Sequence, residues 1–227
     1  MTATLHVVTW NLFHGRSLPP AGRSLREEFA AALADWEWDV ALLQEVPPWW
    51  PPGLARRAGA EHRTALTSRN WVAPLQQALA ERLPDLMKSW GGGANAILSR
   101  RGITDHRQAT LRRWPEHRVA HAIRMSDGTW AVNLHATAHR PARSAVDLWR
   151  ARAAALEWSG TAPLVLGGDL NLREPRLPGF VHAARGTVDH VFCRGWEPDG
   201  SGEALPRGEL SDHAPVAVDL RRPAEHA

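Results

Sequence analysis

Apolar runs of strand length recur along this chain, and five short polar motifs stand at their ends. The runs are too short for helices and have the patterning of buried or half-buried β-strands. Side chains that follow strands lie at the edge of a sheet, where residues distant in sequence can meet. The chain is therefore expected to bring its motifs together at one rim. In chain order they are Thr9-Trp10-Asn11, Gln44-Glu45, Asn133-Leu134-His135, Gly168-Asp169-Leu170-Asn171 and Ser211-Asp212-His213.

The predicted strands come in clusters with few helices between them. Helical spacing covers residues 24–36, 71–82 and 142–158, and the first of these opens with a capping-box pattern from Ser24 to Glu27. Since strands and helices do not alternate strictly, we predict an α/β (α+β) fold with mixed β-sheets flanked by helices. Strand patterns cover residues 4–10, 39–45, 62–67, 94–99, 103–110, 117–125, 129–135, 163–167, 187–193 and 214–220.

The stretch from Pro47 to Pro52 combines prolines with two adjacent tryptophans. Proline removes a backbone donor and fixes φ, so this stretch is predicted to be a rigid loop rather than a regular element. It suits either the mouth of a substrate pocket or contact with another protein.

Length and composition suit one domain over residues 1–227. The 227 residues, of which 44% are hydrophobic, can bury a substantial core without a disulfide or a structural metal. Cys193 is the single cysteine, and the first residues lack the basic and apolar segments of a signal peptide. No apolar run reaches the length of a transmembrane helix. We expect a cytoplasmic protein without integral membrane association.

The basic charge is carried almost wholly by arginine. The net charge is +3 and the isoelectric point is 10.2, and all but one of the 27 basic residues are arginine. Composition bias explains this richness by itself, whereas a role in phosphate binding would use the bidentate guanidinium group. The 12 tryptophans, with no tyrosine, have two similar explanations: core packing, or stacking on a substrate base.

The segment from Gly168 to Asn171 is the most informative motif. A buried strand precedes it, and its glycine allows a sharp turn after which Asp169 and Asn171 point to the same side. One carboxylate and one amide, two residues apart, can hold a water molecule against a phosphorus atom. The alternative is an Asx turn that serves only the fold.

The other motifs are weaker when taken singly. Asn11 and Glu45 follow strands and offer the oxygen ligands that hard divalent metals prefer, but Asn11 alone is more typical of a turn, and Glu45 fits a solvated strand terminus equally well. His135 alone is more typical of a hydrogen-bonded core histidine. His213 is predicted to be oriented by Asp189, which would raise its pKa and provide a cation for phosphate. A polar turn before the last strand is the alternative there.

Together these motifs resemble those of the endonuclease/exonuclease/phosphatase family, which includes DNase I-like nucleases, AP endonucleases, inositol polyphosphate 5-phosphatases and sphingomyelinases. The resemblance extends from residue 9 to residue 215, with further matches at residues 43–46, 93–100 and 188–192. It implies a four-layer α/β sandwich of two packed mixed β-sheets. It also implies a hydrolase that uses Mg²⁺ or Mn²⁺ and in-line attack by an activated water molecule on a phosphoester.

The resemblance implies a role for each motif residue. Asn11 and Glu45 are expected to hold the metal with Asp212 close by, and Asp169 to aim or deprotonate the attacking water. The other implied site residues are Asn171, His135 and His213 as phosphate contacts, Asp189 as the support of His213, and Arg118 and Asn95 as substrate-binding residues.

Two departures from the family pattern stand out. AP endonucleases use an active-site tyrosine, and a chain without tyrosine does not fit that branch. Some nuclease relatives also pair the histidine at the position of His135 with a carboxylate, and the sequence shows no clear partner for it.

Three functions remain open from the sequence. The basic character favours a nuclease-like phosphodiesterase acting on nucleic acid. A compact chain without long insertions has little surface to hold a duplex, which favours a small substrate such as an inositol phosphate, a nucleotide or a phospholipid head group. A catalytically silent binding module would require the loss of a core motif, and every motif is present.

Overall fold

The computed structural model of the protein describes residues 3–67 and 93–223. Within these ranges the helical elements are η1 (Phe13–Gly15), a 3-10 turn, and three α-helices, α1 (Arg26–Asp35), α2 (Pro51–Ala58) and α5 (Pro141–Ser159). The strands are β1 (Thr4–Asn11), β2 (Val40–Val46), β3 (Glu61–Leu66), β4 (Ala94–Ser99), β5 (Ile103–Arg112), β6 (Arg118–Met125), β7 (Trp130–His135), β8 (Leu164–Asp169), β9 (Val181–Arg185), β10 (Asp189–Arg194), β11 (Glu197–Pro198), β12 (Glu203–Ala204) and β13 (Val216–Arg221).

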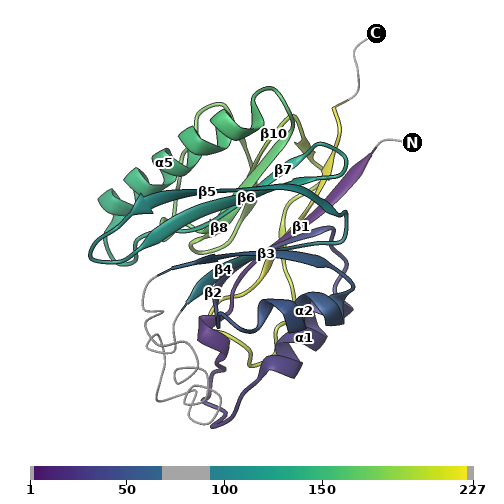
Figure 1. The fold of residues 1–227 in the computed structure, drawn as a ribbon, viewed down its shortest axis with the longest axis vertical. Helices are drawn as coiled ribbons and strands as arrows, with labels where there is room; N and C mark the ends of the chain where they lie inside the picture. Colours follow the sequence, from purple (N-terminus) through teal and green to yellow (C-terminus); the bar gives the residue numbers. More distant parts are fainter. Residues whose placement is uncertain (1–2, 68–92, 224–227) are drawn as a thin grey trace.

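Two β-sheets pack face to face at the centre of the molecule (Figure 1). The first has the order β11-β13-β1-β2-β4-β3, with β12 also paired to β13, and the second has the order β5-β6-β7-β8-β10-β9. In each sheet one central pair is parallel, β1 with β2 and β7 with β8, and the remaining pairs are antiparallel. Both sheets are therefore mixed, as the sequence predicts.

Three layers of buried side chains join the four layers of the sandwich. One cluster lies between the sheets, where residues such as Leu42 of β2 and Val165 of β8 are fully buried. A second packs α1 and α2 on the first sheet, and a third packs α5 on the second sheet. Figure 1 shows the helices on the two outer faces, which confirms the predicted four-layer arrangement.

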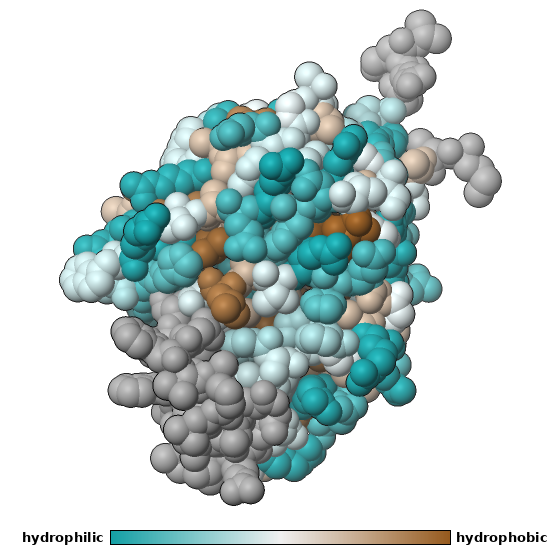
Figure 2. Space-filling view, in the orientation of Figure 1, coloured by the Kyte–Doolittle hydropathy of each residue, from teal (hydrophilic) through white to brown (hydrophobic). Residues whose placement is uncertain are grey.

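The outer surface agrees with this layering. The face shown in Figure 2 is mostly hydrophilic, with small separate hydrophobic areas. Among the helices of the described residues, none is long and apolar enough to cross a membrane.

Several local predictions are wrong or incomplete. The Pro47–Pro52 stretch does not stay irregular, because α2 begins at Pro51: proline is tolerated in the first helical turn, where the missing N–H has no intrahelical partner. The capping box does not form. Helix α1 starts one residue later than the box requires, with buried Leu25 at the N-cap and no side-chain cap. The short strands β9, β11 and β12 were not predicted, and the helix predicted over 71–82 lies outside the described residues.

A buried polar bridge fixes the spacing of the two sheets. The Asn133 side-chain amide donates to the backbone carbonyls of Leu43 at 2.8 Å and Ala96 at 2.9 Å, and its Oδ1 accepts from Gln44 Nε2 at 2.8 Å. Asn133 belongs to β7, and its three partners belong to the first sheet. Since unpaired polar groups are costly in a core, these bonds set one relative position of the sheets.

The free energy of unfolding is expected to fall in acid because the fold buries His121. Burial, reinforced by the neighbouring His106, lowers the pKa of His121 from 6.5 to about 3. Between pH 6.5 and about pH 3, His121 is therefore protonated in the unfolded chain and neutral in the folded chain. We expect the free energy of unfolding to fall by about 1.4 kcal/mol per pH unit for this histidine between pH 6.5 and pH 3. Urea unfolding at pH 7 and pH 4.5 measures the slope.

A pair of variants isolates this contribution. His121→Asn is expected to reduce the slope, whereas His139→Asn, which changes an exposed histidine, is expected to leave it unchanged. Equal slopes for wild type and His121→Asn would contradict the prediction.

Candidate active site

The two parallel strand pairs end at the same edge of the sandwich. Asn11 at the end of β1 lies beside Gln44 of β2, and His135 at the end of β7 lies opposite Asp169 of β8. The two sheets meet here, because Asn11 Nδ2 donates to Asp169 Oδ2 at 3.0 Å. The site is thus assembled from both sheets.

Asp169 is the centre of this group. Its Oδ1 accepts from the backbone N–H of Asn171 at 3.0 Å, and its Oδ2 lies 3.4 Å from His135 Nε2 and 3.9 Å from His213 Nε2. Burial, with the charge of Asp189 added, raises the pKa of this carboxyl to about 7, although His213 and the bonds from Asn11 and Asn171 act in the opposite direction. A group with this pKa can exchange a proton near neutral pH.

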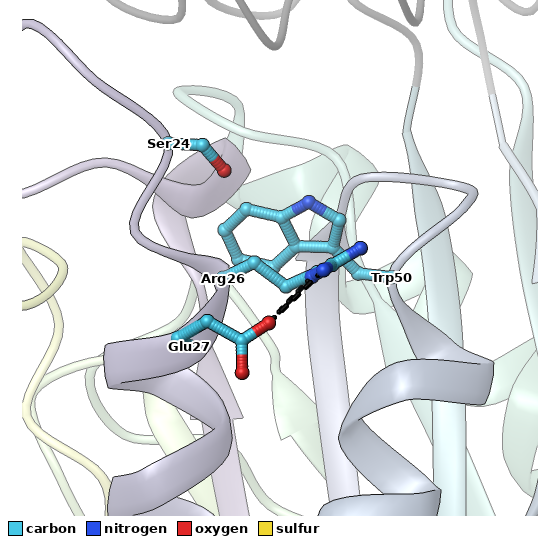
Figure 3. A pocket seen from close by; sticks show the side chains of 4 residues that line it. All are labelled: Ser24, Arg26, Glu27 and Trp50. Carbon is cyan, nitrogen blue, oxygen red and sulfur yellow. Dashed lines mark hydrogen bonds and ion pairs between the residues drawn. The ribbon is translucent and has the colours of Figure 1, made fainter.

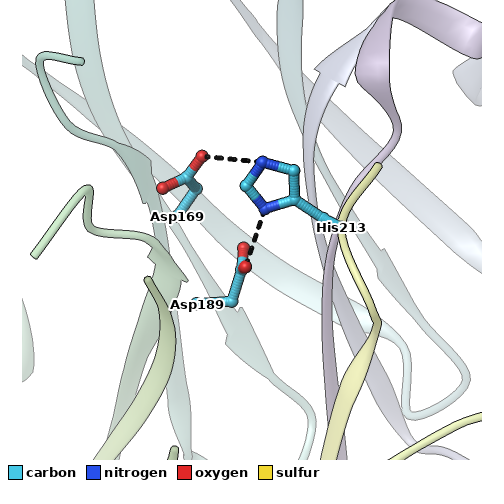
Figure 4. Close-up of side chains that lie close together, drawn as sticks. All are labelled: Asp169, Asp189 and His213. Atoms are coloured by element: carbon cyan, nitrogen blue, oxygen red, sulfur yellow. Dashed lines mark hydrogen bonds and ion pairs between the residues drawn. The ribbon is translucent and has the colours of Figure 1, made fainter. Parts of the chain in front are cut away.

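Asp189 holds His213 in one orientation (Figure 4). The carboxylate Oδ2 lies 2.7 Å from His213 Nδ1, and the dashed lines of Figure 4 show the imidazole between Asp189 and Asp169. Burial alone would lower the pKa of His213, but the hydrogen bond and charge of Asp189, with Asp169 and Asp212, raise it to about 9. The imidazole is therefore a cation at neutral pH. Trp10 Nε1 fixes the backbone by donating to the His213 carbonyl at 3.1 Å.

Glu45 faces two histidines. Its Oε2 lies 3.1 Å from His14 Nε2, and its Oε1 lies 3.8 Å from His135 Nε2. Burial, together with the charges of Arg118, His14 and His213, lowers the pKa of His135 well below 6.5. His135 is therefore neutral. The sequence showed no clear carboxylate partner for it, and the structure places Glu45 and Asp169 beside it.

His14 was not predicted. It follows Asn11 by three residues in η1, with φ +54°, and a turn of this kind has no periodic signal in the sequence. Its place depends on Gly15, because a Cβ there would come within 2.3 Å of the Trp50 indole. Trp50 is 4% exposed and packs on Phe29, so this ring of the Pro/Trp stretch supports the turn that carries His14.

Arg118, Asn95 and Asn171 lie around this centre. Arg118 starts β6, is 8% exposed and pairs with Glu116, and its buried Nε has no hydrogen-bond partner within residues 3–67 and 93–223. Asn95 Nδ2 donates to the Val119 carbonyl at 3.2 Å, and its buried Oδ1 has no partner in the same ranges. Asn171 adopts φ +50° and donates from its side chain to Ala136 at 3.1 Å.

The donor set fits a hard divalent cation. Ligand atoms of Asp169, Asp189 and His213 lie within 4.8 Å of one another, and among the described residues the buried Oδ1 of Asp189 has no hydrogen-bond partner. Because the cationic imidazole has no free lone pair, the carboxylate oxygens of Asp169 and Asp189 are the possible ligands of this group. Burial and, after it, the charge of Asp189 disfavour the charged form of Asp169, and a cation would offset both effects. This group differs from the implied ligands Asn11, Glu45 and Asp212. Asn11 contacts it through Asp169, Asp212 lies 3.9 Å from His213, and Glu45 is linked to it through His135.

A family model decides the relationship suggested by the motifs. The model described as "Endonuclease/Exonuclease/phosphatase family" matches residues 8–213. The chain belongs to the endonuclease/exonuclease/phosphatase family. Membership indicates a hydrolase of phosphoester bonds, and family members generally use divalent metals.

Solved structures of the same fold include endonuclease/exonuclease/phosphatase proteins from two bacteria. The protein from Beutenbergia cavernae is 19% identical with a TM-score of 0.69, covering 96% of this chain and 72% of that one. The protein from Bacteroides vulgatus is 15% identical with a TM-score of 0.72, covering 97% and 100%. TDP2 from C. elegans is 17% identical with a TM-score of 0.68, covering 96% and 75%. No curated protein matches the sequence significantly.

In this member of the endonuclease/exonuclease/phosphatase family, one cavity adjoins the site and another lies apart from it. A cavity of about 500 Å³ is lined by Asp189, Asp212 and His213, with Arg185 also on its wall. A separate cavity of about 310 Å³ lies between α1 and the start of α2 (Figure 3). Its lining is Ser24, Arg26, Glu27 and Trp50, and none of these belongs to the carboxylate and histidine group.

Proposed function

We propose that the protein is a Mg²⁺- or Mn²⁺-dependent phosphodiesterase with nuclease-like activity. The main support is a single arrangement: Asp169, with its pKa near neutrality, lies within 4 Å of both a neutral and a cationic imidazole, those of His135 and His213. This combination of a proton acceptor and phosphate-binding groups is what in-line attack by water requires. Both sheets contribute to it, which supports the prediction of one domain over residues 1–227.

In this proposal each side chain has a defined task. A divalent cation, when bound, neutralises charge on the phosphoryl and leaving oxygens. Glu45, Asn11 and Asp212 would hold it, with Asp189 as a further carboxylate. Asp169 takes a proton from the water that attacks phosphorus.

Imidazole and amide groups hold the phosphate in the same proposal. His213, cationic and oriented by Asp189, binds one non-bridging phosphate oxygen, and neutral His135 donates to another. Asn171 orients Asp169 through its backbone N–H and contacts the phosphate. Arg118 and Asn95 bind the substrate beside it.

Metal dependence is the direct test of this proposal. We expect EDTA to abolish cleavage of a labelled oligonucleotide and Mg²⁺ or Mn²⁺ to restore it. Because Glu45→Gln keeps the size of the side chain but removes its charge, this variant is expected to need about 10–100-fold more metal for half-maximal activity. Full activity in EDTA, or an unchanged metal requirement, would contradict the proposal. Glu27→Gln, at an exposed position on α1, is the matched control.

A small phosphoester is the second candidate substrate. The cavity beside His213, about 500 Å³ in volume, is of a size that takes a small molecule such as a nucleotide or an inositol phosphate. The two candidates differ in their response to salt. Polyanion cleavage is expected to weaken steeply between 50 and 200 mM salt, whereas hydrolysis of a small ester is expected to change little.

A further inference from the structure

Trp114 is the most exposed large hydrophobic residue of the described chain. Its exposed fraction is 80%, and it lies in the loop of residues 113–117 that joins β5 to β6. Most other tryptophans in the described ranges are buried or half-buried, as expected for core packing. An indole left almost wholly in solvent has no role in holding the fold.

Both ends of this loop are held beside the catalytic group. At one end Arg112 Nε donates to Thr137 Oγ1 at 3.2 Å, and its terminal nitrogen pairs with Asp147 at 3.0 Å. Thr137 follows His135 by two residues. At the other end Arg118 starts β6, which pairs with β7 so that Ala120 lies opposite Leu134, the residue before His135. The loop therefore forms part of the rim of the site.

The chemistry of the loop fits a nucleobase next to a phosphate. The indole of Trp114 offers a flat apolar face, and exposed Arg113 with Arg118 offers guanidinium groups for phosphate oxygens. A membrane surface fits less well, because an interfacial anchor needs several apolar side chains and this loop adds the acidic Glu116 to its one aromatic residue. A protruding ring stacks on a base whose face is uncovered, as in a single strand or at an unpaired strand end.

We propose that Trp114 stacks on an unpaired base adjacent to the scissile phosphate, so that the substrate is single-stranded nucleic acid or an unpaired strand end. The inference rests on the proposed phosphodiesterase activity and names the substrate class of the same site. Trp114 acts here in substrate specificity and not in the chemical step.

Two labelled single-stranded oligonucleotides of equal length test the role of Trp114. One carries bases, and the other is a base-free backbone of tetrahydrofuran nucleotides. We expect Trp114→Ala to raise the KM for the base-bearing strand about tenfold with kcat little changed, and to leave the base-free strand unaffected. Trp114→Phe, which keeps a ring, is expected to retain most of the preference. Trp149→Ala removes a half-exposed tryptophan two turns into α5 and is expected to change neither substrate.

A binding arm separates failure of stacking from failure of the proposed function. Fluorescence anisotropy of the same strands in EDTA reports binding without turnover. Loss of preference for bases in Trp114→Ala supports stacking even if no strand is cleaved, and in that case only the proposed activity fails. Equal binding by wild type and Trp114→Ala, or the same loss on both strands, would overturn the inference. So would a Trp114-dependent affinity for phosphatidylglycerol vesicles with no effect on oligonucleotides.

Discussion

Asp169→Asn is expected to lower kcat by about 10³-fold while the protein stays folded. The asparagine keeps the shape of the side chain, but it cannot take a proton from water, and loss of a positioned general base costs about 10²–10⁴-fold. Turnover of a labelled oligonucleotide at saturating Mg²⁺ measures the loss. Asp199→Asn, at an exposed position, is the control and is expected to be fully active. Wild-type turnover by Asp169→Asn would refute the assignment of the base.

The same substitution is expected to stabilise the metal-free protein. The folded-state pKa of about 7 lies above the ordinary value of 3.8, so the folded chain binds more protons than the unfolded chain between these pH values. Stability therefore falls as the pH rises through this window, and the penalty is complete above pH 7. At pH 8 in EDTA, Asp169→Asn is expected to gain about 1 kcal/mol or more, or about 2–4 °C in Tm. Saturating Mn²⁺ is expected to reduce this advantage, because a nearby cation offsets the cost of burying the charged Asp169 carboxylate in the wild type.

Gly168→Ala is expected to have the largest effect on the fold. The Cβ would lie 1.9 Å from the backbone oxygen of Leu134 on the neighbouring strand β7, and the residue has φ +136°. Neither a flexible side chain nor a rotamer change can relieve a clash with backbone, so β8 and β7 must move apart. We expect a loss of about 4 kcal/mol or more, seen as a fall in Tm of about 10 °C or more.

Gly59 serves as a control, because it has a positive φ but no atom in the described part of the chain that a Cβ would clash with. Gly59 caps α2 with φ +64°, and a Cβ there would meet no atom within 4 Å. Gly59→Ala is therefore expected to cost only about 1–2 kcal/mol. Similar Tm values for the two variants would show that the contact with Leu134 does not constrain β8.

Much of the fold could be predicted because its strands are short and their apolar patterns are clear. The central strands β1, β2, β7 and β8 are almost fully buried, and such strands give continuous apolar runs in the sequence. Strand β9 was missed because Val181–Arg185 combines alanine, histidine and arginine, which have weak strand preference, and gains its place by pairing with β10. Helix α2 was missed because proline usually excludes a helix. Its prolines lie at the first helical positions, where no backbone N–H is needed.

The site was predictable as a set of residue types but not as a set of contacts. Asp189 could be assigned to His213 because a buried carboxylate commonly orients an imidazole, and the two side chains do meet at 2.7 Å. The contact of His14 with Glu45 depends on three residues with φ near +50°, Phe13, His14 and Glu45, and on the packing of Trp50 against Gly15. These are tertiary features, and local sequence patterns do not contain them.

The bridge through Asn133 has a consequence for engineering this protein. The two sheets each supply only part of the polar group, Asn11 and Glu45 from the first sheet, and His135 and Asp169 from the second. The distances between these side chains therefore depend on the spacing of the two sheets. The longer amide of Asn133→Gln would change every distance across the site at once, so activity should respond to core substitutions that touch neither substrate nor ion.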